Sequence, residues 1–155
     1  MALQTDYQLL AAQLRALAEG ETMRLPVLAN ATALIMENLP DVSWAGFYLR
    51  EGDELVLGPF QGKVACMHIG WGKGVCGTAA FEDRTQLLPN VHEFPGHIAC
   101  DSASQSEVVV PLHEQGRVSG VLDLDSTSLA RFSEDDARGL ELFGAVLEEL
   151  LPALA

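Results

Sequence analysis

Apolar residues recur at helical spacing near both ends of the chain, and the N-terminal part predicts two helices. The first helix has apolar positions at steps of four and three residues, at Leu10, Leu14 and Leu17. Gly20 is a residue type that suits the end of this helix. The second helix is expected to begin near Pro26, because proline is favoured in the first turn, and to end before Pro40.

A third helix is predicted near the C-terminus. Ser133 is a residue type that caps helices, and Asp136, three residues later, is at the position that completes a capping box. The apolar stripe that follows steps by three, four and three residues and consists of Leu140, Phe143, Leu147 and Leu150. We expect this helix to pack its apolar stripe against the rest of the molecule.

Between the helices, alternating apolar and β-branched residues predict two β-hairpins. Residues 42–50 and 54–58 form the first hairpin, and residues 107–112 and 118–125 form the second. The segment 59–104 between the hairpins is rich in Gly, Pro, His and Cys and is expected to be irregular. Ordered connecting segments of this length usually have a function.

The order helix, helix, hairpin, long segment, hairpin, helix predicts an α+β fold. Antiparallel hairpins between terminal helices favour a single antiparallel sheet with the helices on one face. The other face would then hold a ligand pocket under the long segment. The chain has no internal repeat and no Pro- or Ser-rich linker, so residues 1–155 are expected to form a single domain.

Strand periodicity predicts a cluster of carboxylates on the face that has no helices. Successive side chains of a strand point to opposite faces, so the apolar Leu122 and Leu124 should oppose Asp123 and Asp125. Glu107 should lie on the same face as the two aspartates, which would be about 7 Å apart along the strand. One interpretation is an ordinary solvated face. The other is a pocket, because like charges on one face need a cation or a shared proton.

Two aromatic residues of the first hairpin are expected on the same side of their strand. The period of two places Trp44 and Tyr48 on one face and Phe47 and Leu49 on the other. Trp44 and Tyr48 could therefore form the aromatic wall of the pocket. The alternative is plain core packing, since large aromatic side chains dominate hydrophobic cores.

Composition and charge restrict the classes of partner. Hydrophobic residues make up 48% of the 155 residues, which is typical of a globular protein. Nine Lys and Arg residues against 22 Asp and Glu residues give a net charge of −13, which disfavours binding to nucleic acid or to an anionic membrane surface. We find no signal peptide and no apolar stretch that could span a bilayer, so a cytoplasmic location is expected.

All three cysteines lie in the long segment: Cys66, Cys76 and Cys100. In the cytoplasm they should be reduced thiols, either reactive or simply buried. The glycines around Cys76 predict a turn that leads into a helix, whose N-terminus and Lys73 would lower the pKa of the thiol. Zinc binding by Cys66, Cys100 and the nearby histidines His68, His92 and His97 is an alternative, but no pair of these residues has a strong ligand spacing.

Several motifs together resemble a known family. The last strand, GVLDLDS (120–126), followed by FSEDD (132–136), is similar to GAF domains. More narrowly, the chain resembles the free methionine-(R)-sulfoxide reductases over essentially its whole length. Besides GVLDLDS, the stretches that carry this resemblance are WAGFYL (44–49), GPFQGKVAC (58–66), GKGVCGTAA (72–80), PNVHEFPGHIACD (89–101) and SQSEVVVPL (104–112).

The resemblance implies an enzyme that reduces free L-methionine-R-sulfoxide and is recycled by thioredoxin or another dithiol, with no cofactor and no metal. The three motif cysteines of the family fall on Cys66, Cys76 and Cys100. Its pocket carboxylates fall on Glu107, Asp123 and Asp125, and its aromatic wall falls on Trp44 and Tyr48. GAF domains often form dimers through their terminal helices, so a homodimer is a further expectation.

The order of the thiol chemistry stays open at this point. We predict Cys100 as the nucleophile, because it precedes the strand that begins with Glu107, and His97 could help to form the thiolate. Cys66 would be the first resolving thiol, and Cys76 would relay the disulfide or support the site. Cys76 is the alternative nucleophile. The alternative function is a GAF module that senses a small molecule and performs no chemistry.

Overall fold

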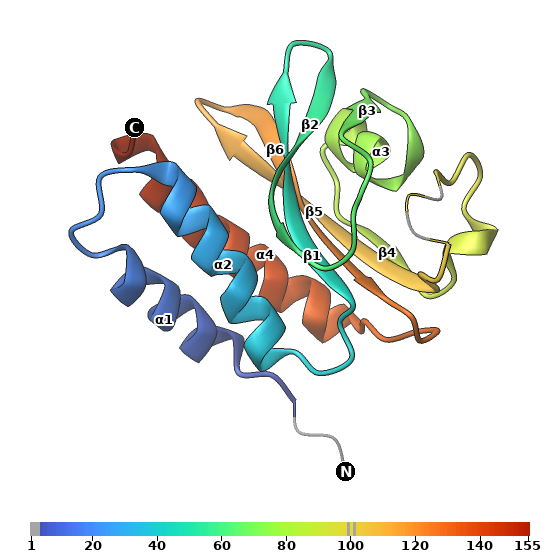
Figure 1. Cartoon of the computed structure of the whole chain (residues 1–155), viewed down its shortest axis with the longest axis horizontal. Helices are drawn as coiled ribbons and strands as arrows, with labels where there is room; N and C mark the ends of the chain where they lie inside the picture. Colours follow the sequence, from blue (N-terminus) through green and yellow to red (C-terminus); the bar gives the residue numbers. More distant parts are fainter. Residues whose placement is uncertain (1–3, 99, 101) are drawn as a thin grey trace.

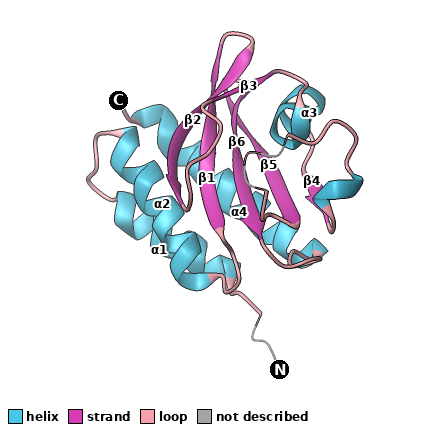
Figure 2. Ribbon diagram, turned by 45° about the vertical axis from the view of Figure 1, so that its right-hand side comes forward, coloured by secondary structure: helices cyan, strands magenta, loops and turns pink. Residues whose placement is uncertain are grey.

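The computed structural model describes residues 4–98, 100 and 102–155. Its strands form an antiparallel six-stranded sheet with the order β3-β2-β1-β6-β5-β4 (Figure 2). The strands are β1 (Trp44–Glu51), β2 (Glu54–Gln61), β3 (His68–Gly70), β4 (Gln86–Leu88), β5 (Ser106–Glu114) and β6 (Arg117–Ser126). The two predicted hairpins are confirmed as β1–β2 and β5–β6, and β1 pairs with β6 to join them.

Three helices cover one face of the sheet, as predicted, and a shorter helix lies on the other (Figure 1). The three are α1 (Tyr7–Ala18), α2 (Arg24–Asn38) and α4 (Glu134–Leu150). Helices α2 and α4 pack against the strands, and α1 packs against α2 and α4. The shorter helix is α3 (Gly74–Glu82), which contacts β5 and β6. Two 3-10 turns complete the structure, η1 (Val91–Glu93) and η2 (Leu151–Ala153).

The sheet separates two hydrophobic clusters, and strand periodicity predicts which side chains enter each. Phe47, Leu122 and Leu124 are buried against the three helices. Tyr48 and Val121, their neighbours along the strands, are buried on the opposite side against α3. The alternation predicted for β1, β5 and β6 is therefore confirmed, and the face without the long helices is free to build a site.

The helix boundaries follow the predicted signals closely. Ser133 and Asp136 form the capping box of α4, since the Asp136 amide donates to Ser133 Oγ at 3.1 Å and the Ser133 amide to Asp136 Oδ2 at 2.9 Å. Helix α1 ends two residues before Gly20, which has φ +79°. The prediction for Leu17 was wrong, because its side chain is 50% exposed on the outer side of α1.

The prediction that residues 59–104 are irregular was wrong. Strand β2 continues to Gln61, and the segment also contains β3, α3 and β4. Strands β3 and β4 have three residues each, too short for a periodic pattern to appear in the sequence. The helix predicted around Cys76 is confirmed as α3.

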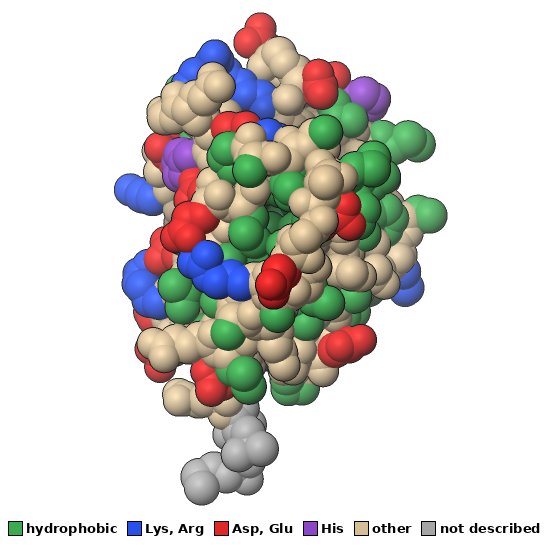
Figure 3. Space-filling model, turned by 90° about the vertical axis from the view of Figure 1, so that its left-hand side faces the viewer, with side chains coloured by type: hydrophobic (Ala, Val, Ile, Leu, Met, Phe, Trp, Pro, Cys, Tyr) green, Lys and Arg blue, Asp and Glu red, His purple; other side chains and the backbone are tan. Residues whose placement is uncertain are grey.

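The outer surface carries charged and apolar side chains side by side. Figure 3 shows this on the side of the molecule where α1 and the α1–α2 connection lie. Exposed apolar residues of α1 and α2 and their connection are Leu9, Leu17, Met23 and Leu25. None of the helices in the described part of the chain is both long and apolar enough to cross a membrane. Dimerisation through the terminal helices stays a prediction.

Candidate active site

A small cavity lies between the sheet and α3, on the face opposite the three long helices. Its volume is about 50 Å³, and it reaches the surface between the segments that follow β2 and η1. The residues predicted for a pocket that line it are Trp44, Tyr48, Cys76, Cys100, Glu107, Asp123 and Asp125. The structure therefore brings together side chains that are up to 81 positions apart in the sequence (Trp44 to Asp125).

The strand register explains this convergence. In one row across the sheet, Trp44 of β1 is opposite Asp125 of β6, which in turn is opposite Glu107 of β5. In the row that is two residues further along the strands, Asp123 lies between Gly46 and Val109. Three neighbouring strands thus place two aromatic residues and three carboxylates above one patch of sheet.

The aromatic wall is fixed to the cysteine-bearing segment by hydrogen bonds. Trp44 stacks on Tyr48, with ring centroids 5.9 Å apart, and on Phe60, at 5.2 Å. Trp44 Nε1 donates to the Lys63 carbonyl at 3.0 Å, and the Tyr48 hydroxyl donates to the Cys66 carbonyl at 2.9 Å. The wall therefore also holds the segment that carries Cys66 in place.

The carboxylates are buried, so the interpretation as a solvated face was wrong for two of them. Glu107 is 7% exposed and Asp123 is 4% exposed, whereas Asp125 is half-buried. Burial, reinforced by the charges of Asp123 and Asp125, raises the pKa of Glu107 well above its usual range. Burial also raises the pKa of Asp123. A carboxyl group that keeps its proton near neutral pH can act as a proton donor.

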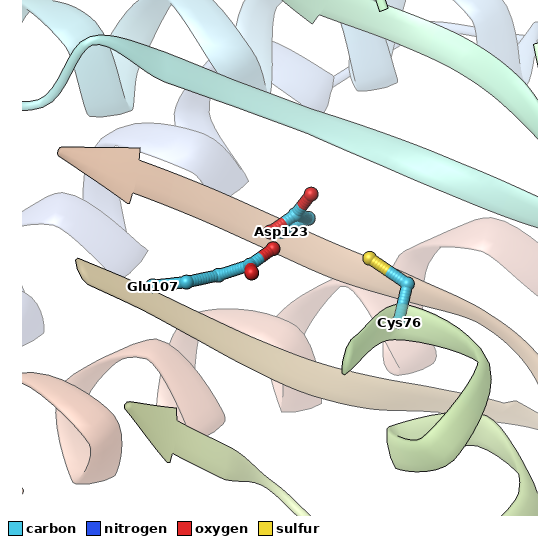
Figure 4. A group of neighbouring side chains, drawn as sticks. All are labelled: Cys76, Glu107 and Asp123. Atoms are coloured by element: carbon cyan, nitrogen blue, oxygen red, sulfur yellow. The ribbon is translucent and has the colours of Figure 1, made fainter. Parts of the chain in front are cut away.

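Cys76 lies beside these carboxyl groups at the first turn of α3. Figure 4 shows the side chains of Cys76, Glu107 and Asp123 directed toward one another from α3, β5 and β6. Burial raises the pKa of the Cys76 thiol, and the charges of Asp123 and Glu107 raise it further. The prediction that the helix N-terminus and Lys73 would lower this pKa was wrong, because desolvation and the two carboxylates dominate.

Cys66 and Cys100 are joined in a disulfide, with their Cα atoms 5.4 Å apart. Both residues are only half-buried, and Cys100 lines the cavity. The expectation of three reduced thiols therefore does not hold for this pair. The disulfide also precludes the zinc ligand set considered from the sequence, since thiolates are needed to bind the metal.

The nearby histidines have different surroundings. Outside the cavity, His68 Nδ1 is 2.9 Å from Glu54 Oε1. His97 lines the cavity with Cys100, and its ring centroid is 6.5 Å from that of His92. Burial, with a smaller effect of His92, lowers the pKa of His97, so this imidazole is neutral at physiological pH. A neutral imidazole near a thiol can accept its proton.

Sequence reasoning missed several residues that line the cavity, among them Ser104, Ile98 and Val64. Ser104 is buried and lines the cavity just before β5. Ile98 covers the start of α3, where Gly74 has φ +61° and a Cβ would lie 3.0 Å from Ile98 Cδ1. Val64, which is 88% exposed, is at the rim. All three residues lie in stretches that carry the family resemblance, but their positions at the cavity depend on how the loops pack.

Comparison with known proteins shows the family to which the chain belongs. The GAF domain family model matches residues 22–151. The protein of Escherichia coli (strain K12) named free methionine-R-sulfoxide reductase is 54% identical over 136 residues, which cover 88% of this chain and 82% of that protein.

Solved structures give the same result. The reduced form of fRMsr of Staphylococcus aureus is 47% identical, with a TM-score of 0.91 over 97% of this chain and 99% of that one. The free methionine-R-sulfoxide reductase of Neisseria meningitidis, solved in complex with its substrate, is 42% identical, with a TM-score of 0.91 over 98% of this chain and 96% of that one. The chain therefore belongs to the GAF domain family and, within it, to the family of free methionine-R-sulfoxide reductases.

Proposed function

We propose that this chain reduces free L-methionine-R-sulfoxide to methionine. The observation that carries the proposal is a cysteine pair beside a buried pocket of carboxyl groups and aromatic rings. The family supports it, since the Escherichia coli relative is named for this reaction and the Neisseria meningitidis structure contains its substrate.

The pocket has the groups needed to bind a free amino acid. The ammonium group of the substrate would be held by Asp123 and Asp125, and Asp123 Oδ1 is buried with no hydrogen-bond partner among the described residues. Trp44 and Tyr48 would contact the apolar side chain. A methionine sulfoxide within a polypeptide chain has no free ammonium group to bind these carboxylates, so it would be a poor substrate.

Glu107 is the group we propose as proton donor to the sulfoxide oxygen. A thiolate attacks a sulfoxide sulfur only when the oxygen is protonated or hydrogen-bonded, because the oxygen must leave the sulfur without a full negative charge. Burial and two neighbouring carboxylates raise the pKa of Glu107, which favours its protonated form. Asp123 and Asp125 would remain the charged partners of the substrate.

The thiol chemistry follows from the positions of the cysteines. The Cys100 thiolate attacks the sulfoxide sulfur, the S–O oxygen is transferred to Cys100 as a sulfenic acid, and methionine leaves with two electrons gained. The Cys66 thiol then condenses with the sulfenic acid, which releases water and forms the Cys66–Cys100 disulfide. The same disulfide is present in the structure. Cys76 would support the site as a neutral thiol.

Thioredoxin or another dithiol would return the enzyme to its reduced form. A dithiol must approach one sulfur of the disulfide, and Cys66 and Cys100 are both half-buried rather than enclosed. The chain around them exposes apolar side chains that a protein reductant could cover, namely Val64, Met67 and Ile98. Replacement of Met67 by Glu should raise the KM for thioredoxin and leave turnover with dithiothreitol unchanged.

The decisive experiment compares substrates and thiols. With dithiothreitol, we expect turnover of the R sulfoxide of free methionine, no turnover of the S sulfoxide, and none of N-acetylated or peptide-bound sulfoxide. Equal rates on free and peptide-bound sulfoxide would overturn the proposal. A small-molecule sensor would lose no thiols on addition of methionine sulfoxide, whereas the enzyme should lose two per chain.

Single-turnover assays of variants test the order of the thiols. Cys100→Ser should release no methionine, whereas Cys66→Ser should release one equivalent per chain and retain a sulfenic acid that a dimedone-type trap detects. Cys76→Ser is the matched control, and it should complete a turnover that ends in the Cys66–Cys100 disulfide. A full turnover in Cys100→Ser, with the trapped adduct on Cys76, would reverse the assignment.

A further inference from the structure

We propose that Cys76, Glu107 and Asp123 form a binding site for a thiophilic divalent cation, with Zn²⁺ as the best fit. The thiol sulfur and one oxygen from each carboxyl group lie within 4.8 Å of one another. The three side chains come from α3, β5 and β6, and all three are buried (Figure 4). The Cys66–Cys100 disulfide takes no part in this site.

A second observation points to a cation at this position. Asp123 Oδ1 is the one buried side-chain nitrogen or oxygen atom, among the described residues, that has no hydrogen-bond partner. Asp123 is 96% buried, since its exposed fraction is 4%, and it lines the cavity. A buried oxygen without a partner is unfavourable, because its desolvation is not compensated, and a bound cation would supply the missing interaction.

The donor set decides which cation fits. Mg²⁺ and Ca²⁺ require six or more oxygen ligands, and a thiolate is a poor ligand for either. Zn²⁺ accepts mixed sulfur and oxygen ligands in a tetrahedron, and three protein ligands leave its fourth position to water. With Zn–S and Zn–O bonds of about 2.0–2.3 Å, ligand atoms lie roughly 3.5 Å apart, so these side chains need to approach by no more than about 1.3 Å.

Charge and protons balance in the binding step. The Cys76 thiol loses its proton to solvent, as does any carboxyl group that is protonated, and Zn²⁺ binds to the resulting anions. The like charges that raise the pKa of the Cys76 thiol are then neutralised by the cation. Because protons are released, the affinity should increase with pH.

The site would make the enzyme sensitive to zinc in both redox states. Cys76 keeps a free thiol in the disulfide form. On the proposed function, the cation and the ammonium group of the substrate would occupy the same position beside Asp123. Zinc would then be an inhibitor that acts without touching the redox-active pair.

The test uses the oxidised full-length chain without an affinity tag, in which Cys66 and Cys100 cannot bind metal. Titration with Co²⁺ should produce a thiolate-to-cobalt absorption band in the near ultraviolet that saturates at one equivalent, and Zn²⁺ should displace it. Cys76→Ser should lose the band. Asp123→Asn should bind Co²⁺ at least about tenfold more weakly, which tests the site if Cys76→Ser does not fold.

Matched controls identify the site. The exposed histidines are removed in His68→Gln and His92→Gln, and both variants should keep the band unchanged. Absence of the band in the oxidised parent chain, or its persistence in a folded Cys76→Ser variant, would overturn the proposal. Neither outcome depends on reductase activity, so failure of the zinc site and failure of the proposed function are distinguishable.

Discussion

The carboxyl group of Glu107 is the single side chain on which the proposed chemistry depends most. Glu107→Gln keeps the size of the side chain but removes the transferable proton. We expect kcat/KM for free methionine-R-sulfoxide to fall at least about 10²-fold, the lower end of the effect of a positioned general acid. Thermal unfolding should be unchanged or shifted upward, because the neutral amide avoids the repulsion from Asp123 and Asp125.

Glu51→Gln is the matched control for this substitution. Glu51 is exposed at the end of β1, at the opposite end of the strand from Trp44. The substitution should therefore leave kcat/KM unchanged. Full activity of Glu107→Gln would remove Glu107 from the mechanism and leave it a buried structural carboxyl.

Gly46 is the residue that leaves room for the aromatic wall. A Cβ at this position would lie 2.7 Å from Trp44 Cη2 and would also collide with Phe60. Gly46→Ala should therefore lower the free energy of unfolding by about 1–3 kcal/mol, the usual cost of overpacking. It should also lower kcat/KM, since Trp44 would have to move within the pocket.

The control for Gly46→Ala is a glycine outside the pocket. Gly116, in the β5–β6 turn, has φ +73°, and no heavy atom lies within 4 Å of the position that a Cβ would take there. Gly116→Ala should cost about 1–2 kcal/mol of stability through its left-handed backbone but leave kcat/KM unchanged. Equal kcat/KM values for the two variants would show that the wall tolerates movement of Trp44.

At the level of secondary structure, His113 connects elements on opposite faces of the sheet. It lies on β5, with Nδ1 2.6 Å from Glu148 of α4 and Nε2 2.5 Å from Asp83 at the end of α3. Burial lowers the pKa of His113, but the hydrogen bonds to the two carboxylates outweigh this effect and raise the pKa above its usual value.

The raised pKa predicts a pH dependence of stability. The stabilisation by protonated His113 is complete at pH values below the pKa of this residue in the unfolded chain, which is about 6.5. It is lost as the pH rises through the higher pKa of His113 in the folded chain. His113→Gln should therefore lower the free energy of unfolding more at pH 5.5 than at pH 9. Because the side chain is about one-third exposed, we expect a difference of about 0.5–1 kcal/mol in urea unfolding. An equal loss at both pH values would contradict this interpretation.

Strand periodicity predicted the part of the site that the sheet builds. The alternation along β6 places Leu122 and Leu124 on the opposite face of the sheet from Asp123. On β1 it places Tyr48 on the opposite face from Phe47. Longer strands give enough positions for the two faces to be distinguished. Strands β3 and β4 could not be predicted, since their three residues are paired by contacts with β2 and β5 rather than by their own pattern.

The electrostatics of the site were harder to predict than its composition. The sequence identifies Cys76 at a helix start, but the sign of its pKa shift depends on burial and on carboxyl groups from β5 and β6. The Cys66–Cys100 pairing likewise depends on two loops that meet above the sheet. Local sequence signals carry no information on such distances, so these features required the folded structure.

For the molecule as a whole, the disulfide predicts a stability that depends on redox state. Cys66 and Cys100 are 34 residues apart, and the loop that they close contains β3, α3 and β4. In the chain-entropy model, closing a loop of this length stabilises the folded state by about 3–4 kcal/mol. The oxidised chain should therefore unfold at a temperature on the order of 10 °C above that of the reduced chain.

Calorimetry with and without dithiothreitol measures this difference directly. Cys66→Ser cannot form the disulfide and should unfold at one temperature under both conditions, close to that of the reduced parent chain. Cys76→Ser is the matched control, because it removes a buried thiol but keeps the pair, and it should retain the full redox-dependent shift. If the parent chain unfolds at the same temperature in both states, the loops must be held together without the disulfide. In that case reduction would not loosen the segment over the pocket, and the bond would serve the redox cycle alone.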